Sequence, residues 1–123
     1  MKALIVDDSR IMRMILSRML KQVGFTDIGE AQDGKEAMTY LANNPDTQVA
    51  LVDWNMPEMN GIELVEAVRQ DDRLRDVRLV MVTGELEMAQ VDRALTLGAN
   101  EYVMKPFTAE VIKDKLQLLG VDL

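Results

Sequence analysis

The feature that most constrains the fold is an alternation of short apolar runs with segments of helical periodicity. We predict strands at residues 2–6, 26–31, 48–53, 77–82 and 101–104, and helices at 10–23, 33–41, 61–70, 86–97 and 108–119. Strands that alternate with helices at such short spacing run parallel and are joined by right-handed crossovers, with helices on both faces. The sequence therefore predicts a doubly wound α/β fold, and its length suits one domain over residues 1–123.

The starts and ends of the first two helices carry local signals. Ser9 is expected to cap the first helix and Gly24 to end it. Asp33 and Glu36 are expected to form a capping box at the second helix. One face of the first helix is predicted to be buried, through residues spaced by four and two leucines beside them: Ile11, Ile15, Met19 and Val23, with Leu16 and Leu20.

Composition removes several kinds of chemistry. The 123 residues include no cysteine and no histidine, which excludes thiol chemistry, imidazole bases and most zinc sites. The formal net charge of −7 would repel a phosphate backbone, so we expect no nucleic-acid binding by this domain alone. No apolar run is long enough to span a bilayer and no signal peptide is visible, so a cytoplasmic protein without membrane insertion is expected.

Reactive side chains stand where the predicted strands end. Asp7 and Asp8 follow the first strand, Asp53 ends the third, Thr83 follows the fourth, and Lys105 follows the fifth. The carboxyl ends of parallel strands meet at one edge of a sheet, where α/β folds bind ligands. Two like charges ~4 Å apart repel by about 4 kcal/mol at an effective dielectric near 20, and Mg²⁺ would relieve that repulsion. Carboxylates, a lysine and a hydroxyl together indicate phosphoryl transfer to aspartate.

A purely structural interpretation is also open. Lys105 could pair with Asp53, while Asp7 and Asp8 could cap the first helix. Capping and one ion pair do not explain why all of these groups stand at strand ends.

The motifs VDDSR, LVDWNMPEMNG, MVTGE and EYVMKPF stand in this order along the chain. With them the chain resembles a response-regulator receiver domain, most closely the single-domain chemotaxis (CheY-like) type. The resemblance implies a flavodoxin-like (βα)5 fold with a five-stranded parallel sheet in order 2-1-3-4-5. It also implies that Asp53 accepts a phosphoryl group from a phosphohistidine of a sensor histidine kinase or phosphotransfer protein. Such a phosphoacceptor promotes its own phosphorylation and dephosphorylation and is not an enzyme proper.

The resemblance also assigns roles to individual residues of the site. It implies that Asp8, Asp53 and the backbone carbonyl of Asn55 ligate Mg²⁺, with Asp7 acting through water. Lys105 would pair with a phosphoryl oxygen, and a cis peptide bond often precedes the matching proline, Pro106, in this family. Asn55 and Glu85 would tune the rate of dephosphorylation. They are not counted among the reactive groups.

The resemblance implies a switch as well. The hydroxyl of Thr83 would turn to hydrogen-bond the phosphoryl group, and Tyr102 would rotate inward behind it. That movement would alter a partner-binding face on the fourth helix, fifth strand and fifth helix. The residues expected on this face are Met88, Val91, Leu95 and Tyr102.

Several partners and alternatives remain open at this point. A downstream target protein is expected, with the flagellar motor switch as one candidate, and a phosphatase as another partner. Glu87 and Met88 stand where motor-binding relatives carry basic residues. The chain could also be a phosphorelay intermediate or the receiver of a longer regulator. An aspartate-nucleophile phosphohydrolase fits poorly because its nucleophile lies on the first strand with a second Asp two residues on. An FMN binder would need a phosphate-cradling loop where Asp7 and Asp8 stand.

Overall fold

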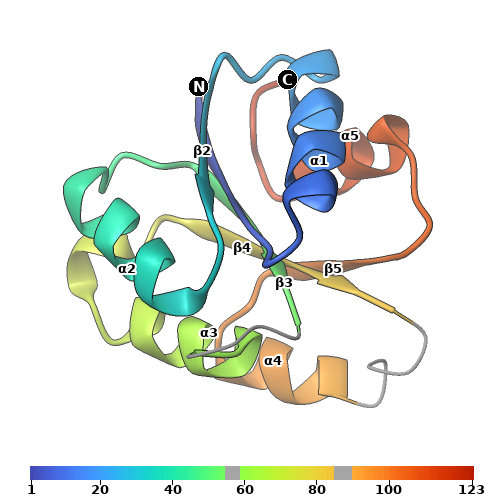
Figure 1. The fold of residues 1–123 in the computed structure, drawn as a ribbon. Helices are drawn as coiled ribbons and strands as arrows, with labels where there is room; N and C mark the ends of the chain where they lie inside the picture. The colour runs from blue at the N-terminus through green and yellow to red at the C-terminus, as the bar shows by residue number, and fades with distance from the viewer. Residues whose placement is uncertain (55–58, 85–89) are drawn as a thin grey trace.

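The computed structural model describes residues 1–54, 59–84 and 90–123. They form a five-stranded sheet in the order β2-β1-β3-β4-β5, with every neighbouring pair parallel (Figure 1). The strands are β1 Lys2–Val6, β2 Asp27–Ala31, β3 Val49–Asp53, β4 Arg78–Thr83 and β5 Glu101–Met104. The helices are α1 Arg10–Gln22, α2 Gly34–Asn43, α3 Gly61–Arg69, α4 Val91–Leu97 and α5 Ala109–Leu118, with a short 3-10 helix, η1 Asp72–Leu74. The predicted fold class and strand order are confirmed.

The sheet separates two hydrophobic cores. Helices α1 and α5 cover one face, and α2, α3 and α4 cover the other (Figure 1). Alternate residues of β1 point to opposite faces, so Leu4 lies in the core with α2 and α3, whereas Ile5 lies in the core with α1 and α5. Burial on both faces explains why the central strands read as unbroken apolar runs instead of alternating ones.

The predicted buried stripe of α1 is wrong in its first half. Ile11 is 68% exposed and Ile15 is 40% exposed, whereas Leu16 and Leu20 are buried. A step of four residues turns a helix by ~40° beyond a full turn, so side chains spaced by four drift steadily around the axis. The stripe that meets the sheet is centred on Leu16 and Leu20, and Ile11 lies farthest from it.

The caps agree with most of the expectations. Ser9 accepts from the backbone N–H of Met12, and Gly24, with a φ of 115°, follows the end of α1. Asp33 accepts from the N–H of Glu36, but the Glu36 carboxylate accepts from the N–H of Gln32 and not from that of Asp33. The expected capping box of α2 is therefore only half formed.

Other features of the helices differ from the prediction or were not predicted. A full capping box joins Asn60 and Glu63 at α3. The η1 helix was not predicted, because three residues are too few to show a period. Residues 85–89 of the predicted fourth helix lie outside the described residues. No helix in the described ranges has the length and apolarity needed to cross a membrane.

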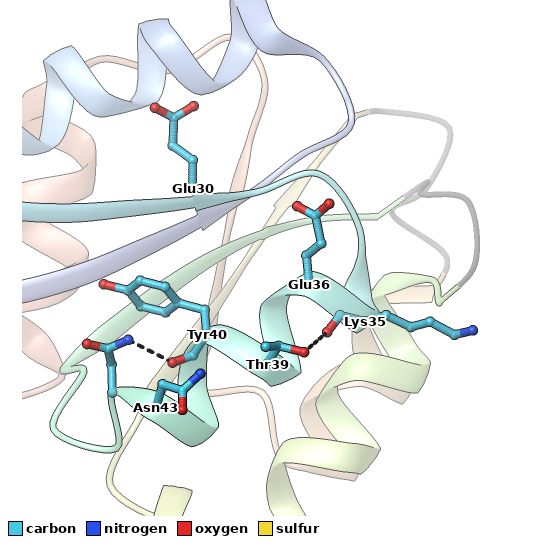
Figure 2. A pocket seen from close by; sticks show the side chains of 7 residues that line it. Glu30, Lys35, Glu36, Thr39, Tyr40 and Asn43 are labelled. Atoms are coloured by element: carbon cyan, nitrogen blue, oxygen red, sulfur yellow. Dashed lines mark hydrogen bonds between the residues drawn. The ribbon is translucent and has the colours of Figure 1, made fainter.

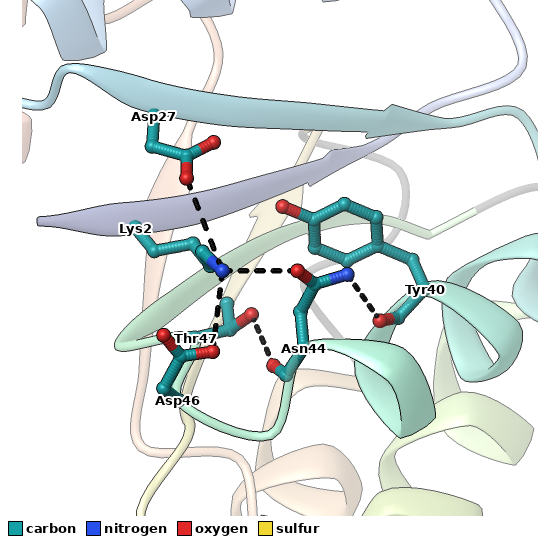
Figure 3. A network of polar contacts seen from close by, with 6 residues as sticks. All are labelled: Lys2, Asp27, Tyr40, Asn44, Asp46 and Thr47. Carbon is teal, nitrogen blue, oxygen red and sulfur yellow. Dashed lines mark hydrogen bonds and ion pairs between the residues drawn. The ribbon is translucent and has the colours of Figure 1, made fainter.

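A polar network fastens the amino-terminal edge of the sheet (Figure 3). Lys2 Nζ donates to Asn44 Oδ1 at 2.9 Å and lies 3.3 Å from Asp46 Oδ1 and 3.9 Å from Asp27 Oδ2. Thr47 Oγ1 donates to the Asn44 carbonyl at 2.7 Å and so closes the turn into β3. These groups stand at the opposite edge from the carboxyl ends of the strands. They connect the starts of β1 and β2 to the turn before β3, and none of the residues predicted to be reactive takes part in them.

Candidate functional site

The three predicted carboxylates meet at the carboxyl edge of the sheet. Strands β1 and β3 are neighbours in register, with Val6 opposite Val52, so the residues that follow them emerge side by side. Oxygen atoms of Asp7, Asp8 and Asp53 all lie within 4.8 Å of one another. Three carboxylates at this separation form a strongly anionic pocket, with a donor set that suits a hard divalent cation.

Asp7 carries the clearest sign of a missing partner. Its side chain is 1% exposed, and Oδ1 accepts from the N–H of Ser9 at 2.8 Å. Oδ2 is buried and accepts no hydrogen bond from any described residue. Burial is the main cause that raises the pKa of this carboxyl group, and the charge of Asp53 raises it further. A buried carboxylate oxygen without a partner is costly, so a cation or a water fits there.

Asp53 lies between the acidic residues and a lysine. Lys105 Nζ is 3.4 Å from Asp53 Oδ1, and the Asp53 side chain is 13% exposed. Burial raises the pKa of Asp53 most, while Lys105 and the backbone N–H of Trp54 act to lower it. The Lys105–Asp53 pair of the structural interpretation is present, but Ser9 caps α1 and Asp7 does not. That interpretation leaves the free Asp7 oxygen unexplained.

The main chain around Asp53 is held tightly. The N–H of Gly61 donates to the carbonyl of Trp54 at 3.1 Å, which ties the start of α3 to the end of β3. A Cβ at position 61 would lie 3.0 Å from the Asp53 carbonyl oxygen and 2.8 Å from Met81 Cε, so glycine permits this close approach. The Asp53 carboxylate, which we expect to be reactive, therefore stands on a well-supported strand end.

Lys105, Thr83 and Tyr102 come from the neighbouring strands β4 and β5. The N–H of Lys105 donates to the carbonyl of Thr83 at 2.8 Å, and the Lys105–Pro106 peptide bond is cis, as expected. Thr83 is fully buried and its hydroxyl donates to the carbonyl of Gly84 at 3.2 Å. Tyr102 is half-buried, with Lys115 Nζ 4.8 Å from the centre of its ring.

The expected partner-binding face is only partly described. Leu95 is 36% exposed on α4, whereas Val91 is 4% exposed and packs inward. In this structure Val91 therefore does not contribute to the surface. Asn55, Glu85 and Met88 lie outside the described residues, so their predicted roles stay predictions.

Arg13 is a residue that the sequence reasoning missed. Its Nη1 donates to the carbonyl oxygen of Asp7 at 2.7 Å, and its Nε donates to Glu30 Oε1 at 3.0 Å. The only sequence signal is weak: Arg13 lies one helical turn after the Ser9 cap and therefore near the end of β1.

A cavity of about 490 Å³ lies elsewhere, between β2 and α2 (Figure 2). It is lined by Glu30, Lys35, Glu36, Thr39, Tyr40, Asn43 and Asn44. None of the reactive groups at the strand ends lines it. The carboxylates expected to be reactive therefore lie together at the carboxyl edge of the sheet, outside this hollow.

Without a divalent cation, we expect the stability of the protein to fall as pH rises through the folded-state pKa values of Asp7 and Asp53. Both values are raised above the ordinary 3.8, so the protonated carboxyl groups favour the folded state and ionisation removes that contribution. Asp53→Asn should flatten this loss and stabilise the metal-free protein at neutral pH by on the order of 1 kcal/mol. Urea unfolding in chelator across a pH series measures the free energy of unfolding of the unsubstituted chain and of Asp53→Asn. If both proteins lose the same stability with rising pH, the expectation is wrong.

The chain is similar to known proteins over most of its length. The family model of the response regulator receiver domain matches residues 3–117. The chemotaxis protein CheY1 of Helicobacter pylori is 47% identical over 119 residues, covering 97% of this chain and 96% of that protein. The chemotaxis protein CheY of Pseudomonas aeruginosa is 45% identical over 117 residues, covering 95% and 94%.

Solved structures show the same fold. Chemotaxis response regulator CheY4 of Vibrio cholerae aligns with a TM-score of 0.84 at 33% identity, covering 96% of this chain and 97% of that one. The CheX–CheY–BeF3–Mg²⁺ complex from Borrelia burgdorferi contains a chain that aligns with a TM-score of 0.88 at 27% identity, covering 98% and 90%.

Proposed function

This chain belongs to the response-regulator receiver family, and we propose that Asp53 is its phosphoacceptor in a Mg²⁺-dependent reaction. Relatives that are 45–48% identical over nearly the whole chain are chemotaxis proteins, and the chain is a two-component response regulator of that type. Members of the family are signalling phosphoacceptors and not classical enzymes. The observation that carries the proposal is the buried, unpartnered Asp7 oxygen beside Asp8 and Asp53.

The residues present fit a Mg²⁺ ion. In the proposal Asp8 and Asp53 bind it directly, together with the backbone carbonyl of Asn55, and Asp7 binds through a water molecule. A bound Mg²⁺ would neutralise the repulsion between an incoming phosphoryl group and this anionic pocket. The chemistry of the site also favours Mg²⁺ because the ligands are hard oxygen atoms.

In the transfer step, a carboxylate oxygen of Asp53 attacks the phosphorus of a phosphohistidine. The P–N bond breaks with its electron pair going to the imidazole, and a P–O bond forms to give an acyl phosphate on Asp53. Lys105 Nζ, already 3.4 Å from Asp53, provides positive charge for a phosphoryl oxygen. The Thr83 hydroxyl can turn from the Gly84 carbonyl to donate to another.

The proposed output follows from the position of Thr83. Its reorientation would open space for Tyr102, whose ring now lies under Lys115. A change there alters the surface made by α4, β5 and α5, where we place the docking of a downstream target such as the flagellar motor switch. A histidine kinase or phosphotransfer protein is the proposed donor, and a phosphatase a further partner. Asn55 and Glu85 remain proposed rate-tuning positions.

The test uses Trp54, which is buried, directly follows Asp53 and is the sole tryptophan of the sequence. We expect its emission to change when Mg²⁺ is added and to change again when a small acyl phosphate follows. Intact-mass measurement should find one phosphoryl adduct with Mg²⁺ and none in chelator. An equal yield of adduct in chelator would refute the Mg²⁺ dependence, and the absence of any adduct with Mg²⁺ would refute the phosphoacceptor itself.

A further inference from the structure

We propose that Arg13 is a positioning residue for the anionic pocket, which acts by holding the main chain of Asp7, and that Glu30 holds Arg13 in place. This inference rests on the proposed function, because it concerns how the chain presents its carboxylates to Mg²⁺. It adds a residue that touches neither the ion nor the phosphoryl group.

The Arg13 guanidinium connects three elements of the fold. From α1 it donates through Nη1 to the Asp7 carbonyl at the end of β1, at 2.7 Å. Through Nε it donates to Glu30 Oε1 on β2, at 3.0 Å, and Glu30 projects from its strand toward α1 (Figure 2). The Arg13 side chain is 15% exposed and that of Glu30 is 49% exposed. The arginine is thus largely enclosed, and its partner reaches it from the surface.

The hydrogen bonds of Asp7 show what Arg13 controls. The N–H of Asp7 donates to the carbonyl of Ala31 at 3.0 Å, and its Oδ1 accepts from the N–H of Ser9. Its carbonyl oxygen accepts from Arg13, and its buried Oδ2 has no hydrogen-bond partner among the described residues. Two of these three contacts come from the main chain, so Arg13 supplies the one that a substitution can remove.

The carbonyl of Asp7 belongs to the same planar peptide unit as the N–H of Asp8. A hydrogen bond that fixes the Asp7 carbonyl oxygen therefore fixes the orientation of this peptide unit. It thereby sets the direction in which the chain leaves β1 and the position of the exposed Asp8. An arginine suits this task because its planar fork offers two donors to acceptors on different elements. A lysine ammonium could reach one acceptor, but it would not hold both in a fixed geometry.

Electrostatics and positioning predict opposite effects on Mg²⁺ binding. If Arg13 acted only as a charge, its removal would strengthen the binding of a cation nearby. If it positions the ligands, its removal weakens binding, as loss of groups that orient metal ligands typically does by ~10-fold or more. The sign of the change in affinity therefore separates the two roles.

The experiment measures the Mg²⁺ affinity of the full chain by Trp54 emission, with no phosphodonor present. We expect Arg13→Met to weaken Mg²⁺ binding by ~10-fold and Arg13→Lys to lie between Arg13→Met and the unsubstituted chain. Arg18 is exposed on the same helix and lines a surface hollow that does not include Asp7, so Arg18→Met removes the same charge, serves as the matched control and should bind normally. If Arg13→Met is too unstable to titrate, the same comparison is made with Arg13→Lys, whose binding should still be weaker.

A second measurement needs no metal. The amide nitrogen resonance of Asp8 reports the hydrogen bond on the Asp7 carbonyl, so it should move in metal-free Arg13→Met and stay in place in Arg18→Met. Unchanged or tighter Mg²⁺ binding by the Arg13 variants, or an unmoved Asp8 resonance, would overturn the inference while the proposed function stood. Failure of both the unsubstituted chain and Arg18→Met to bind Mg²⁺ would refute the proposed Mg²⁺ site and this inference with it.

Discussion

Replacing Asp53 with asparagine is expected to abolish phosphoryl acceptance from a small acyl phosphate, to below ~1% of the original rate. The amide keeps the shape of the side chain but is far too poor a nucleophile to form the acyl phosphate. Asp7 and Asp8 cannot replace it, because Asp7 is buried with one oxygen already hydrogen-bonded, and the described lysine contact at the site goes to Asp53.

The control for this prediction is Asp27→Asn. Asp27 is an exposed carboxylate at the amino-terminal edge of the sheet, 3.9 Å from Lys2, so the same chemical change there should leave the rate unaltered. Intact-mass time courses with saturating Mg²⁺ measure both variants. A phosphoryl adduct forming on Asp53→Asn at the original rate would show that another side chain is the acceptor.

Replacing Arg69 with methionine is expected to lower the free energy of unfolding by about 3 kcal/mol, the largest loss of stability among the substitutions that we consider. This guanidinium donates to the carbonyls of Gly98 at 2.8 Å and Val77 at 2.7 Å, and to Asn100 Oδ1 at 2.8 Å. It also donates, at longer distances, to the carbonyls of Leu74 and Arg75. Methionine can fill the space of the stem, but it leaves these acceptors without their charged donor.

Urea unfolding at neutral pH measures this change. The matched control is Arg73→Met, because the Arg73 side chain is exposed and its ion pair with Asp71, at 2.8 Å, lies on the surface, so its loss should barely change stability. Arg69 lies away from the carboxyl ends of the strands, and the folded variant should still form the Asp53 adduct. Equal unfolding curves for the two variants would show that the carbonyl contacts of Arg69 contribute little.

The described strands were predictable because the local apolar pattern carries that information, whereas their order 2-1-3-4-5 was implied by the resemblance to the receiver family. Apolar runs such as those of β1 and β3 are buried on both faces only in a parallel sheet covered by helices. Parallel strands then bring their carboxyl ends to one edge. The meeting of Asp7, Asp8 and Asp53 follows from this topology, although those residues are up to 46 positions apart in the sequence.

The unequal burial of neighbouring or similar residues came only from the tertiary structure. Asp7 and Asp8 are adjacent and chemically identical, yet the first is buried with an unpartnered oxygen and the second is exposed. Ile11 and Leu16 read alike as apolar helix positions, yet only Leu16 meets the sheet. Periodicity predicts which residues of a helix share a face, but it does not predict which of them lies at the centre of the buried face. That depends on the rotation of α1 about its axis, which its packing against α5 and β1 determines.

By itself the sequence determined the α/β alternation, the cap at Ser9, and the set of expected reactive groups at the strand ends. The tertiary structure decided which of those groups are desolvated and which side chains support them. Arg13 and Arg69 reach backbone carbonyls, and every residue type has such a carbonyl. No side-chain pattern can mark those acceptors, so contacts of this kind become visible only when the chain is folded.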